Sequence, residues 1–269
     1  MLDTLLLTGA AGTLGRGLAP ALRGACRRLL LSDLPGPLAA HGIADALPCD
    51  LADGAAVHQL LDGVDAIVHL GGYSVEGPFE PILQANIRGL FNLYEAARRR
   101  GVPRIVFASS NHVTGCYGQD ERISPLDPAR PDGNYGVSKL FGEGLASLYH
   151  DRYGIETVCL RIGTCLPTPP DRRALATWIS PADLARLVIA ALTAPAVGFL
   201  VAYGCSDNPR RWWDTQAAWD RLGYVPQDSA EPFAAAVQAI APAAGSPSAR
   251  LQGGTFLAIG PFDDDPRGT

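Results

Sequence analysis

Short apolar runs alternate with longer segments of helical periodicity from Thr4 to Ile162. The runs that read as strands are Thr4–Thr8, Arg28–Ser32, Asp65–Leu70, Arg104–Ser109 and Glu156–Ile162. Between them lie amphipathic segments, of which Pro81–Arg100 and Gly133–Tyr153 are the longest. Such alternation is typical of βαβ units, because consecutive parallel strands must be joined by a crossover. We therefore expect an α/β fold with a parallel sheet and helices on both faces.

The pattern loosens after Ile162, where TCLPTPPDRR follows and its prolines argue against regular structure. A further helix is predicted to begin after Ser180, because Ser180 suits the N-cap, Pro181 the first turn and Asp183 the third helical position.

The last part of the chain carries weaker signals. We expect a strand over Gly198–Tyr203, then two short helices, and a loop over PAAGSPSAR. The sequence shows no internal repeat and no linker long enough to divide domains. We therefore expect one domain over residues 1–269, with a small C-terminal portion in which substrate-binding elements concentrate over 163–269.

Composition excludes several classes of protein. Hydrophobic content of 47% and charged content of 18% fit a globular chain rather than a disordered one. A net charge of −5 gives no general attraction to nucleic acid or anionic membrane. No apolar run approaches the roughly 18 residues of a membrane span, and the N-terminus lacks a signal-peptide pattern. The scattered cysteines and histidines suggest reduced thiols in the cytoplasm and no metal site.

The stretch TGAAGTLG follows the first predicted strand and opens a helix, with Gly9, Gly12 and Gly15 in the turn. Glycines let the turn tighten and bring bare backbone to a pyrophosphate at the positive end of the helix. The alternative is a tight turn without a ligand. In this strand-to-helix context we interpret it as a dinucleotide site in a doubly wound, Rossmann-type sheet.

Two acidic positions follow the next strands. Asp33 ends the second strand, 18 residues after Gly15, where a carboxylate can bind both hydroxyls of an adenosine ribose and repel a 2′-phosphate. That favours NAD over NADP, the alternative being an ordinary turn residue. Asp50 and Leu51 end the third predicted strand, where they could flank the adenine; this signal is weaker.

The stretch NYGVSK places Tyr135 and Lys139 four residues apart at a helix start, and so on one face. A free tyrosine has a pKa near 10, and lowering it by about three units takes roughly 4 kcal/mol. A neighbouring ammonium and a cationic nicotinamide ring can supply that preference. Together with Ser110 at the end of an intervening strand, the pair predicts a tyrosine base.

At this point the chain resembles the extended branch of the short-chain dehydrogenase/reductase family: TGAAGTLG, Asp33, Asn86 after HLGG, Ser110 and the Tyr135/Lys139 pair occur in that family's order. The resemblance implies that Tyr135 is the base, that Lys139 lowers its pKa and holds the nicotinamide ribose, and that Ser110 positions the reacting oxygen. Asn86 would brace its helix or a proton-relay water. The cofactor contacts that the resemblance implies are Gly9, Gly12, Thr13, Leu14, Gly15, Asp33, Asp50, Leu51, Leu70, Gly71, Asn86, Lys139 and Cys165.

Longer stretches are similar to the members of that family that oxidise free hexuronic acids. They are VHLGGYSVEGPFEPILQANIRGLFNLYEAAR, RIVFASSNH, RPDGNYGVSK, RIGTC and LQGGTF. Only 130 residues follow Lys139, which leaves little room for a lobe that holds a nucleotide-sugar. The resemblance implies oxidation of D-glucuronate or D-galacturonate at C1 by NAD, to an aldarolactone that hydrolyses to the aldarate. It also implies a homo-oligomer.

A small cyclic acid must be bound through its own hydroxyls and carboxylate. The stretch FASSNH supplies an amide at Asn111 and an imidazole at His112, and the resemblance positions Arg173 to bind the carboxylate as a charged fork. Thr164 stands where the family generally has serine. The predicted substrate contacts are Ser74, Ser110, Asn111, His112, Tyr135, Thr164 and Arg173.

These substrate residues have ordinary alternatives. Arg173 could be a solvated loop charge, and His112 could cap a turn. Trp212 and Trp213 are interpreted as core or subunit contacts rather than a stacking surface for sugar.

Two other functions stay open at this stage. A sugar epimerase or dehydratase would use the same residues while keeping its NAD bound. A non-catalytic NAD-sensing regulator could share the fold, but the Tyr-Lys pair argues against it. The preference between glucuronate and galacturonate is not determined by the sequence.

Overall fold

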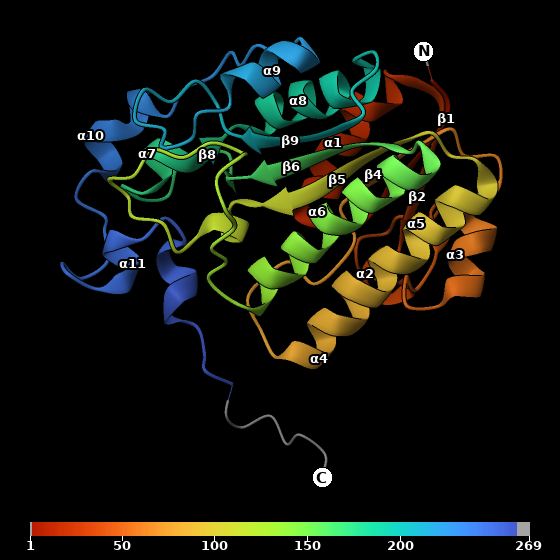
Figure 1. Cartoon of the computed structure of the whole chain (residues 1–269), viewed down its shortest axis with the longest axis horizontal. Helices are drawn as coiled ribbons and strands as arrows, with labels where there is room; N and C mark the ends of the chain where they lie inside the picture. The colour runs from red at the N-terminus through yellow and green to blue at the C-terminus, as the bar shows by residue number, and fades with distance from the viewer. Residues whose placement is uncertain (1, 263–269) are drawn as a thin grey trace.

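The computed structural model describes residues 2–262 of the chain, and its main feature is a seven-stranded sheet in the order β3-β2-β1-β4-β5-β6-β9 (Figure 1). Every neighbouring pair in this sheet is parallel. The strands are β1 (Leu2–Thr8), β2 (Cys26–Asp33), β3 (Leu47–Pro48), β4 (Ala66–His69), β5 (Arg104–Ser110), β6 (Glu156–Ile162) and β9 (Phe199–Gly204). The predicted α/β class is confirmed.

Helices cover both faces of this sheet (Figure 1). The α-helices are α1 (Thr13–Arg23), α2 (Pro35–Ala40), α3 (Gly54–Leu60), α4 (Phe79–Ile82), α5 (Gly89–Arg100), α6 (Asn134–Tyr153), α7 (Ala174–Thr177), α8 (Pro181–Thr193), α9 (Gln216–Leu222), α10 (Ala234–Val237) and α11 (Pro247–Arg250). Short turns of other helix types are η1 (Leu83–Arg88, a π-helix) and the 3₁₀ helices η2 (Asn111–Thr114), η3 (Glu231–Phe233) and η4 (Gly254–Ala258). None of the described helices is both long and apolar enough to cross a membrane.

The two faces of the sheet bury separate cores, because successive side chains of a strand point to opposite sides. Leu5 and Leu7 of β1 pack in the cluster that includes Leu187 of α8. Leu6, between them, belongs to the cluster that includes Leu93 of α5. Burial of each such side chain stabilises the fold by about 1.5–3 kcal/mol.

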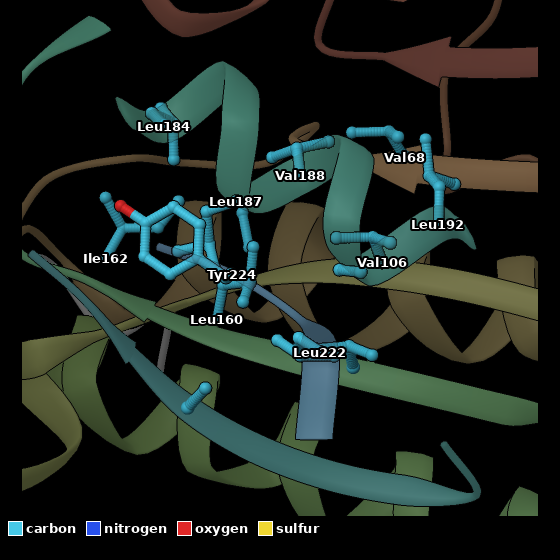
Figure 2. Close-up of a cluster of buried hydrophobic side chains, with 14 of the residues drawn as sticks. Val68, Val106, Leu160, Ile162, Leu184, Leu187, Val188, Leu192, Leu222 and Tyr224 are labelled. Atoms are coloured by element: carbon cyan, nitrogen blue, oxygen red, sulfur yellow. The ribbon is translucent and has the colours of Figure 1, made fainter. Parts of the chain in front are cut away.

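Figure 2 shows the first of these cores, where α8 lies over the central strands. Leu222, the last residue of α9, and Tyr224, which follows that helix, belong to the same cluster and are almost fully buried. The C-terminal part of the chain is thus packed into the main core and not attached beside it.

The strand order reverses direction between β1 and β4, since the chain moves outward from β1 through β2 and β3 and then returns to β4. Ligands of open parallel sheets bind outside the carboxyl ends of the strands at such a switch point. Both the glycine turn after β1 and the loop after β4 lie there.

The predicted helix Pro81–Arg100 is wrong as one regular helix. The structure has α4, the π-helical η1 and α5 in its place. Asn86 lies in η1, and its side chain bonds to the neighbouring loop and to α6. A widened turn that re-aims a polar side chain is a usual role of π-helical insertions.

The segment after Ile162 also differs from its prediction. Thr164–Cys165 forms a short strand, β7, which pairs in parallel with β8 (Trp178–Ile179). The prolines lie in the segment between β7 and α7, so neither of the paired strands contains one. The prediction that Ser180 caps the next helix is confirmed, because its hydroxyl accepts a hydrogen bond from Asp183 N at 2.9 Å.

Two smaller predictions need correction. The stretch PAAGSPSAR is not entirely a loop, because Ser246 caps the four-residue helix α11 within it. The third strand ends at Pro48, so Asp50 and Leu51 lie in the turn that follows. Of the range 163–269 predicted to hold substrate-binding elements, residues 263–269 lie outside the described chain.

Candidate active site

The turn between β1 and α1 is shaped by close backbone contacts. Gly9 has a φ of 72°, and a Cβ there would lie 2.7 Å from the nitrogen of Gly71. A Cβ at Gly15 would lie only 2.1 Å from the oxygen of Gly9. Gly12 is exposed at the N-cap of α1, whose first N–H groups face outward. Thr13 and Leu14 continue the turn. The turn is therefore a bare-backbone cradle that suits a pyrophosphate.

Asp33 lies beside this cradle at the end of β2. Its carboxylate accepts hydrogen bonds from Ala11 N at 2.9 Å and from Leu34 N at 2.8 Å. These bonds fix the carboxylate next to the glycine turn, where an adenosine ribose would lie. The nearby Asp50 is exposed and accepts a hydrogen bond from Ala52 N at 2.9 Å.

The loop after β4 forms the other wall of the cofactor crevice. Leu70 and Gly71 contact the glycine turn, and Leu51 packs against Gly71. Asn86 is 4% exposed and holds this loop: it accepts from Tyr73 N at 2.7 Å and donates to Tyr73 O at 2.9 Å.

The Asn86 amide also donates to the Ser138 hydroxyl of α6 at 2.9 Å. The structure thus gives Asn86 the bracing role that was expected of it. All its described hydrogen bonds are to protein, so a direct cofactor contact by Asn86 remains a prediction.

Tyr135 and Lys139 lie together in the first turns of α6, both nearly buried. The Lys139 ammonium lies 5.5 Å from the centroid of the Tyr135 ring and 5.1 Å from that of Phe107. Burial raises the pKa of Tyr135 to about 12, and the Ser110 hydroxyl partly offsets this. Burial also lowers the pKa of Lys139 to about 8.

Burial within the chain therefore disfavours both the phenolate of Tyr135 and the ammonium of Lys139. The lowered tyrosine pKa predicted from the sequence requires the cationic nicotinamide as well as the lysine.

Glu76 fixes the start of α6, a function that the sequence reading missed. Its carboxylate accepts hydrogen bonds from Asn134 N at 3.0 Å and Tyr135 N at 2.9 Å. A Cβ at Gly133 would lie 2.2 Å from the same carboxylate, so the glycine makes room for it. A carboxylate on the positive end of a helix is favourable, and here it sets the position of the tyrosine. Glu76 lies 59 positions from Tyr135, too far for a local capping pattern.

The residues of FASSNH lie where β5 runs into η2, and Ser110, Asn111 and His112 are all buried. With its amide oxygen turned to the guanidinium, Asn111 accepts from Arg173 Nη2 at 2.9 Å and donates to Ile162 O at 3.0 Å. The His112 ring packs edge-on against the Tyr135 ring, with centroids 5.9 Å apart. The structure thus brings the predicted imidazole next to the predicted base and the predicted amide next to Arg173.

Arg173 comes to this site from the start of α7, where it is the N-cap residue. Its Nε donates to Gln252 O at 2.6 Å and its Nη1 to the Thr164 hydroxyl at 3.2 Å. Burial lowers its pKa, and within residues 2–262 its hydrogen bonds go to no carboxylate. The charges of Asp171 and Asp132 offset this effect of burial only in part. A partly buried guanidinium with no carboxylate in its hydrogen bonds is suited to bind a further anion.

The remaining predicted residues lie around this centre. Ser74 is exposed in the loop after β4, and Thr164 also shares a hydrogen bond of 2.9 Å with Thr177. Cys165 is partly buried in β7, and burial raises its pKa to about 12. Trp213 is 1% exposed and stacks on Tyr203 with ring centroids 4.7 Å apart, which confirms that it is core.

A C-terminal segment, residues 251–256, completes the site and was not assigned from the sequence beyond its resemblance. The Gln252 amide accepts from Trp213 Nε1 at 3.0 Å and donates to Gly118 O at 2.9 Å. The ring of Phe256 stacks on His112 with centroids 3.8 Å apart. Within residues 2–262, no group of three or more His, Cys, Asp and Glu side chains could hold a metal ion.

Comparison with known proteins places these features in a family. The model of the "NAD dependent epimerase/dehydratase family" matches residues 5–166. The chain is 55% identical over 263 residues to the uronate dehydrogenase of Pseudomonas putida, covering 97% of this chain and 98% of that protein.

Solved structures agree. The glucuronic acid dehydrogenase of Chromohalobacter salexigens has a TM-score of 0.92 at 48% identity, over 98% of this chain and 100% of that one. A mutant uronate dehydrogenase of Agrobacterium tumefaciens, complexed with NAD, has a TM-score of 0.89 at 46% identity, over 97% and 98% of the two chains.

Proposed function

The chain belongs to the NAD dependent epimerase/dehydratase family, and we propose that within it the protein is an NAD-dependent dehydrogenase of free hexuronic acids. It oxidises D-glucuronate or D-galacturonate at C1 and releases an aldarolactone. The expectation of an extended short-chain dehydrogenase/reductase is confirmed.

The single observation that carries the substrate class is the Arg173 guanidinium. It lies partly buried, bonded to Gln252 O and Thr164 and next to Asn111, and within residues 2–262 it donates no hydrogen bond to a carboxylate, although the charges of Asp171 and Asp132 act on it. The carboxylate of a uronic acid would complete this arrangement through charge-assisted bonds. A neutral sugar would leave the cation unpaired, which costs binding free energy.

The cofactor is NAD, and the residues present fit it. We propose the contacts expected from the sequence: the backbone of residues 9–15 holds the pyrophosphate, Asp33 the adenosine ribose and Lys139 the nicotinamide ribose. When bound, NAD supplies the hydride acceptor. The remaining cofactor contacts proposed are Asp50, Leu51, Leu70, Gly71, Asn86 and Cys165.

The protein's own part in the reaction is proton transfer and orientation. Tyr135 takes the proton of the C1 hydroxyl, and Ser110 donates a hydrogen bond that holds the reacting oxygen. The Lys139 ammonium, held in a buried position near the Tyr135 ring, stabilises the phenolate. Asn111 and His112 bind ring hydroxyls, with Ser74 and Thr164 at the edge of the same crevice.

The test is NADH absorbance with glucuronate, galacturonate and glucose supplied separately. We expect net NADH from both uronates and very little from glucose. If NAD were only transiently reduced, as in an epimerase or dehydratase, no net NADH would accumulate with either uronate, and the proposed function would be wrong.

We further propose that residues 1–269 act as one Rossmann-type unit in a cytoplasmic homo-oligomer. The unit is supported by a core cluster that runs from Leu5 to Tyr224. The oligomer is supported by large apolar side chains that α5 and α6 leave exposed: Phe91, Val137, Phe141 and Leu148. The location is supported by the six cysteines, all unpaired. Light scattering of the purified protein tests the oligomer, and a monomer would contradict it.

A further inference from the structure

We propose that Asp132 is a positioning residue of this reaction, acting through His112. It fixes the orientation and tautomer of the imidazole so that Nε2 is the atom that meets the sugar. This inference rests on the proposed function for its effect on activity, but not for its effect on the imidazole itself.

The carboxylate of Asp132 is enclosed beneath the site. Its side chain is 1% exposed, and its Oδ2 lies 2.6 Å from His112 Nδ1. Its Oδ1 is buried and makes no hydrogen bond within the described residues. A carboxylate in such a place binds its one donor strongly, because the surroundings screen it little.

Two glycines make the space for this carboxylate. A Cβ at Gly115 or at Gly253 would lie 1.9 Å from Oδ2 of Asp132. These glycines come from two segments far apart in the chain, and their backbones are joined by a bond of 2.8 Å from Gly253 N to Gly115 O. The C-terminal segment 251–256 and the loop after η2 thus close around Asp132, and the two glycines leave the room that its side chain occupies.

The His112 ring is held on its remaining sides. Phe256 stacks on one face at an interplanar angle of 13°, and Tyr135 packs against it edge-on. The backbone N–H of Asp132 also donates to His112 O at 3.3 Å.

The other ring nitrogen, Nε2, makes no hydrogen bond with the described residues, and it is not among the buried unpaired atoms. It therefore keeps some accessible surface, and the proposal requires that this surface faces the crevice beside Tyr135.

The consequence is a defined proton position. With Asp132 as acceptor, Nδ1 carries the hydrogen whether the imidazole is neutral or charged. Nε2 is then the atom available to a substrate hydroxyl or carboxylate. Without Asp132 the ring could place its hydrogen on Nε2 and turn, and the substrate contact would be lost in part of the molecules.

Asp132 could instead act directly on Tyr135, but that effect of its charge would slow the reaction rather than assist it. Burial is the main cause of the raised pKa of Tyr135, and the charge of Asp132 adds to it. Removing that charge would ease deprotonation of Tyr135 and speed the reaction. A loss of activity in Asp132→Asn therefore does not come from Tyr135. The charge of Asp132 also raises the pKa of Arg173, and coupling to His112 in a double-mutant cycle separates the imidazole from that arginine.

The first test is a double-mutant cycle with Asp132→Asn, His112→Ala and the double variant, measured as kcat and KM for glucuronate at saturating NAD. We expect each single change to lower kcat/KM by about tenfold or more. The double variant should be no worse than His112→Ala, because the favourable effect of Asp132 on the reaction is proposed to pass through that ring. Additive losses would overturn the proposal.

A matched control is Asp127→Asn, a change of the same charge in the same loop. The Asp127 carboxylate binds only Ser124 among the described residues. It should leave kcat/KM unchanged. If Asp127→Asn lowered kcat/KM as much as Asp132→Asn does, the loss would come from a disturbed loop and not from the imidazole.

The second test needs no turnover. In the ¹⁵N-labelled, NAD-bound protein, the His112 nitrogen shifts should show a protonated Nδ1, and Asp132→Asn should shift hydrogen toward Nε2. An Nε2-protonated neutral ring in the unmodified protein would overturn the proposal, and this measurement decides if Asp132→Asn fails to fold. If the unmodified enzyme forms no NADH from either uronate, the proposed function fails while the nitrogen shifts still decide the tautomer.

Discussion

The cofactor end and the substrate end of the crevice are built in different ways. The cofactor end is made of backbone: the tight turn at residues 9–15, in which added Cβ atoms would collide, with one fixed carboxylate beside it. The substrate end is made of side chains from four separate segments, carrying His112, Asp132, Arg173 and Phe256.

The difference teaches how the two halves can change. A backbone cradle depends on the path of one short segment, so it tolerates most changes elsewhere. A cluster of side chains from distant segments depends on the whole C-terminal packing, including the Gln252 contacts that hold segment 251–256 in place. Changes at one end should therefore leave binding at the other end intact.

The largest expected effect lies where the two ends meet. Tyr135→Phe removes the base and should lower kcat by about 10²–10⁴-fold, because proton transfer contributes roughly that factor. The Kd for NAD and the KM for glucuronate should change little. Tyr117→Phe is a matched control, since Tyr117 is equally buried and donates its hydroxyl hydrogen to Pro128 O. A Tyr135→Phe enzyme that keeps a tenth of its activity would remove this residue from the mechanism.

The next effect belongs to the substrate end alone. Arg173→Ala should raise the KM for glucuronate by roughly ten- to a hundred-fold, since charge-assisted bonds to the carboxylate are lost. Arg173→Lys should rescue it only partly, because lysine lacks the fork. The Kd for NAD should stay near its original value. Arg172→Ala, a change of the exposed neighbour, is the control.

Glucose kinetics with the unmodified enzyme and with Arg173→Ala show whether Arg173 recognises the carboxylate of the substrate. Glucose has no carboxylate, so the alanine change should matter little for it. If Arg173→Ala lowered kcat/KM equally for glucose and glucuronate, Arg173 would hold Gln252 and Thr164 together without binding the substrate carboxylate.

A smaller effect belongs to the cofactor end. The unmodified enzyme should prefer NAD over NADP, because a 2′-phosphate would meet the Asp33 carboxylate. Asp33→Ala should lower the ratio of kcat/KM for NAD to kcat/KM for NADP by about tenfold. The KM for glucuronate should not change. Asp53→Asn, which alters the cap of α3, is the control. Equal kcat/KM for the two cofactors in the unmodified enzyme would contradict the role of Asp33.

The smallest expected effect is on stability. Burial lowers the folded-state pKa of Lys139 from 10.5 to about 8, so the unfolded chain binds more protons between those values. For this group, the free energy of unfolding should rise with pH across that window. Lys139→Met should stabilise the NAD-free protein at pH 7 by about 1–3 kcal/mol. Urea unfolding at pH 7 and pH 10 measures this, and a destabilised Lys139→Met protein would show that the ammonium is well solvated.

Much of the cofactor end could be predicted from the sequence because its signals are local. The glycine turn, the acid after the second strand and the spacing of Tyr135 and Lys139 each lie within a few residues of a strand end or helix start. The strand Glu156–Ile162 was predicted with its observed bounds, and the other strands of the first 162 residues to within one or two residues, since an apolar run in a parallel sheet is a strong pattern.

The sequence by itself thus determined the fold class and the places of the glycine turn and of the Tyr135/Lys139 pair in it, because strand and helix periodicities and a glycine turn extend over short distances. Only the tertiary structure decided what surrounds the substrate. Nothing local indicates that Glu76 caps α6, that β7 pairs with β8, or that Asp132 lies under His112 between Gly115 and Gly253. These contacts join residues from 14 to well over 100 positions apart, and a contact of that kind leaves no periodicity. It forms only where packing of the whole chain brings the two segments together.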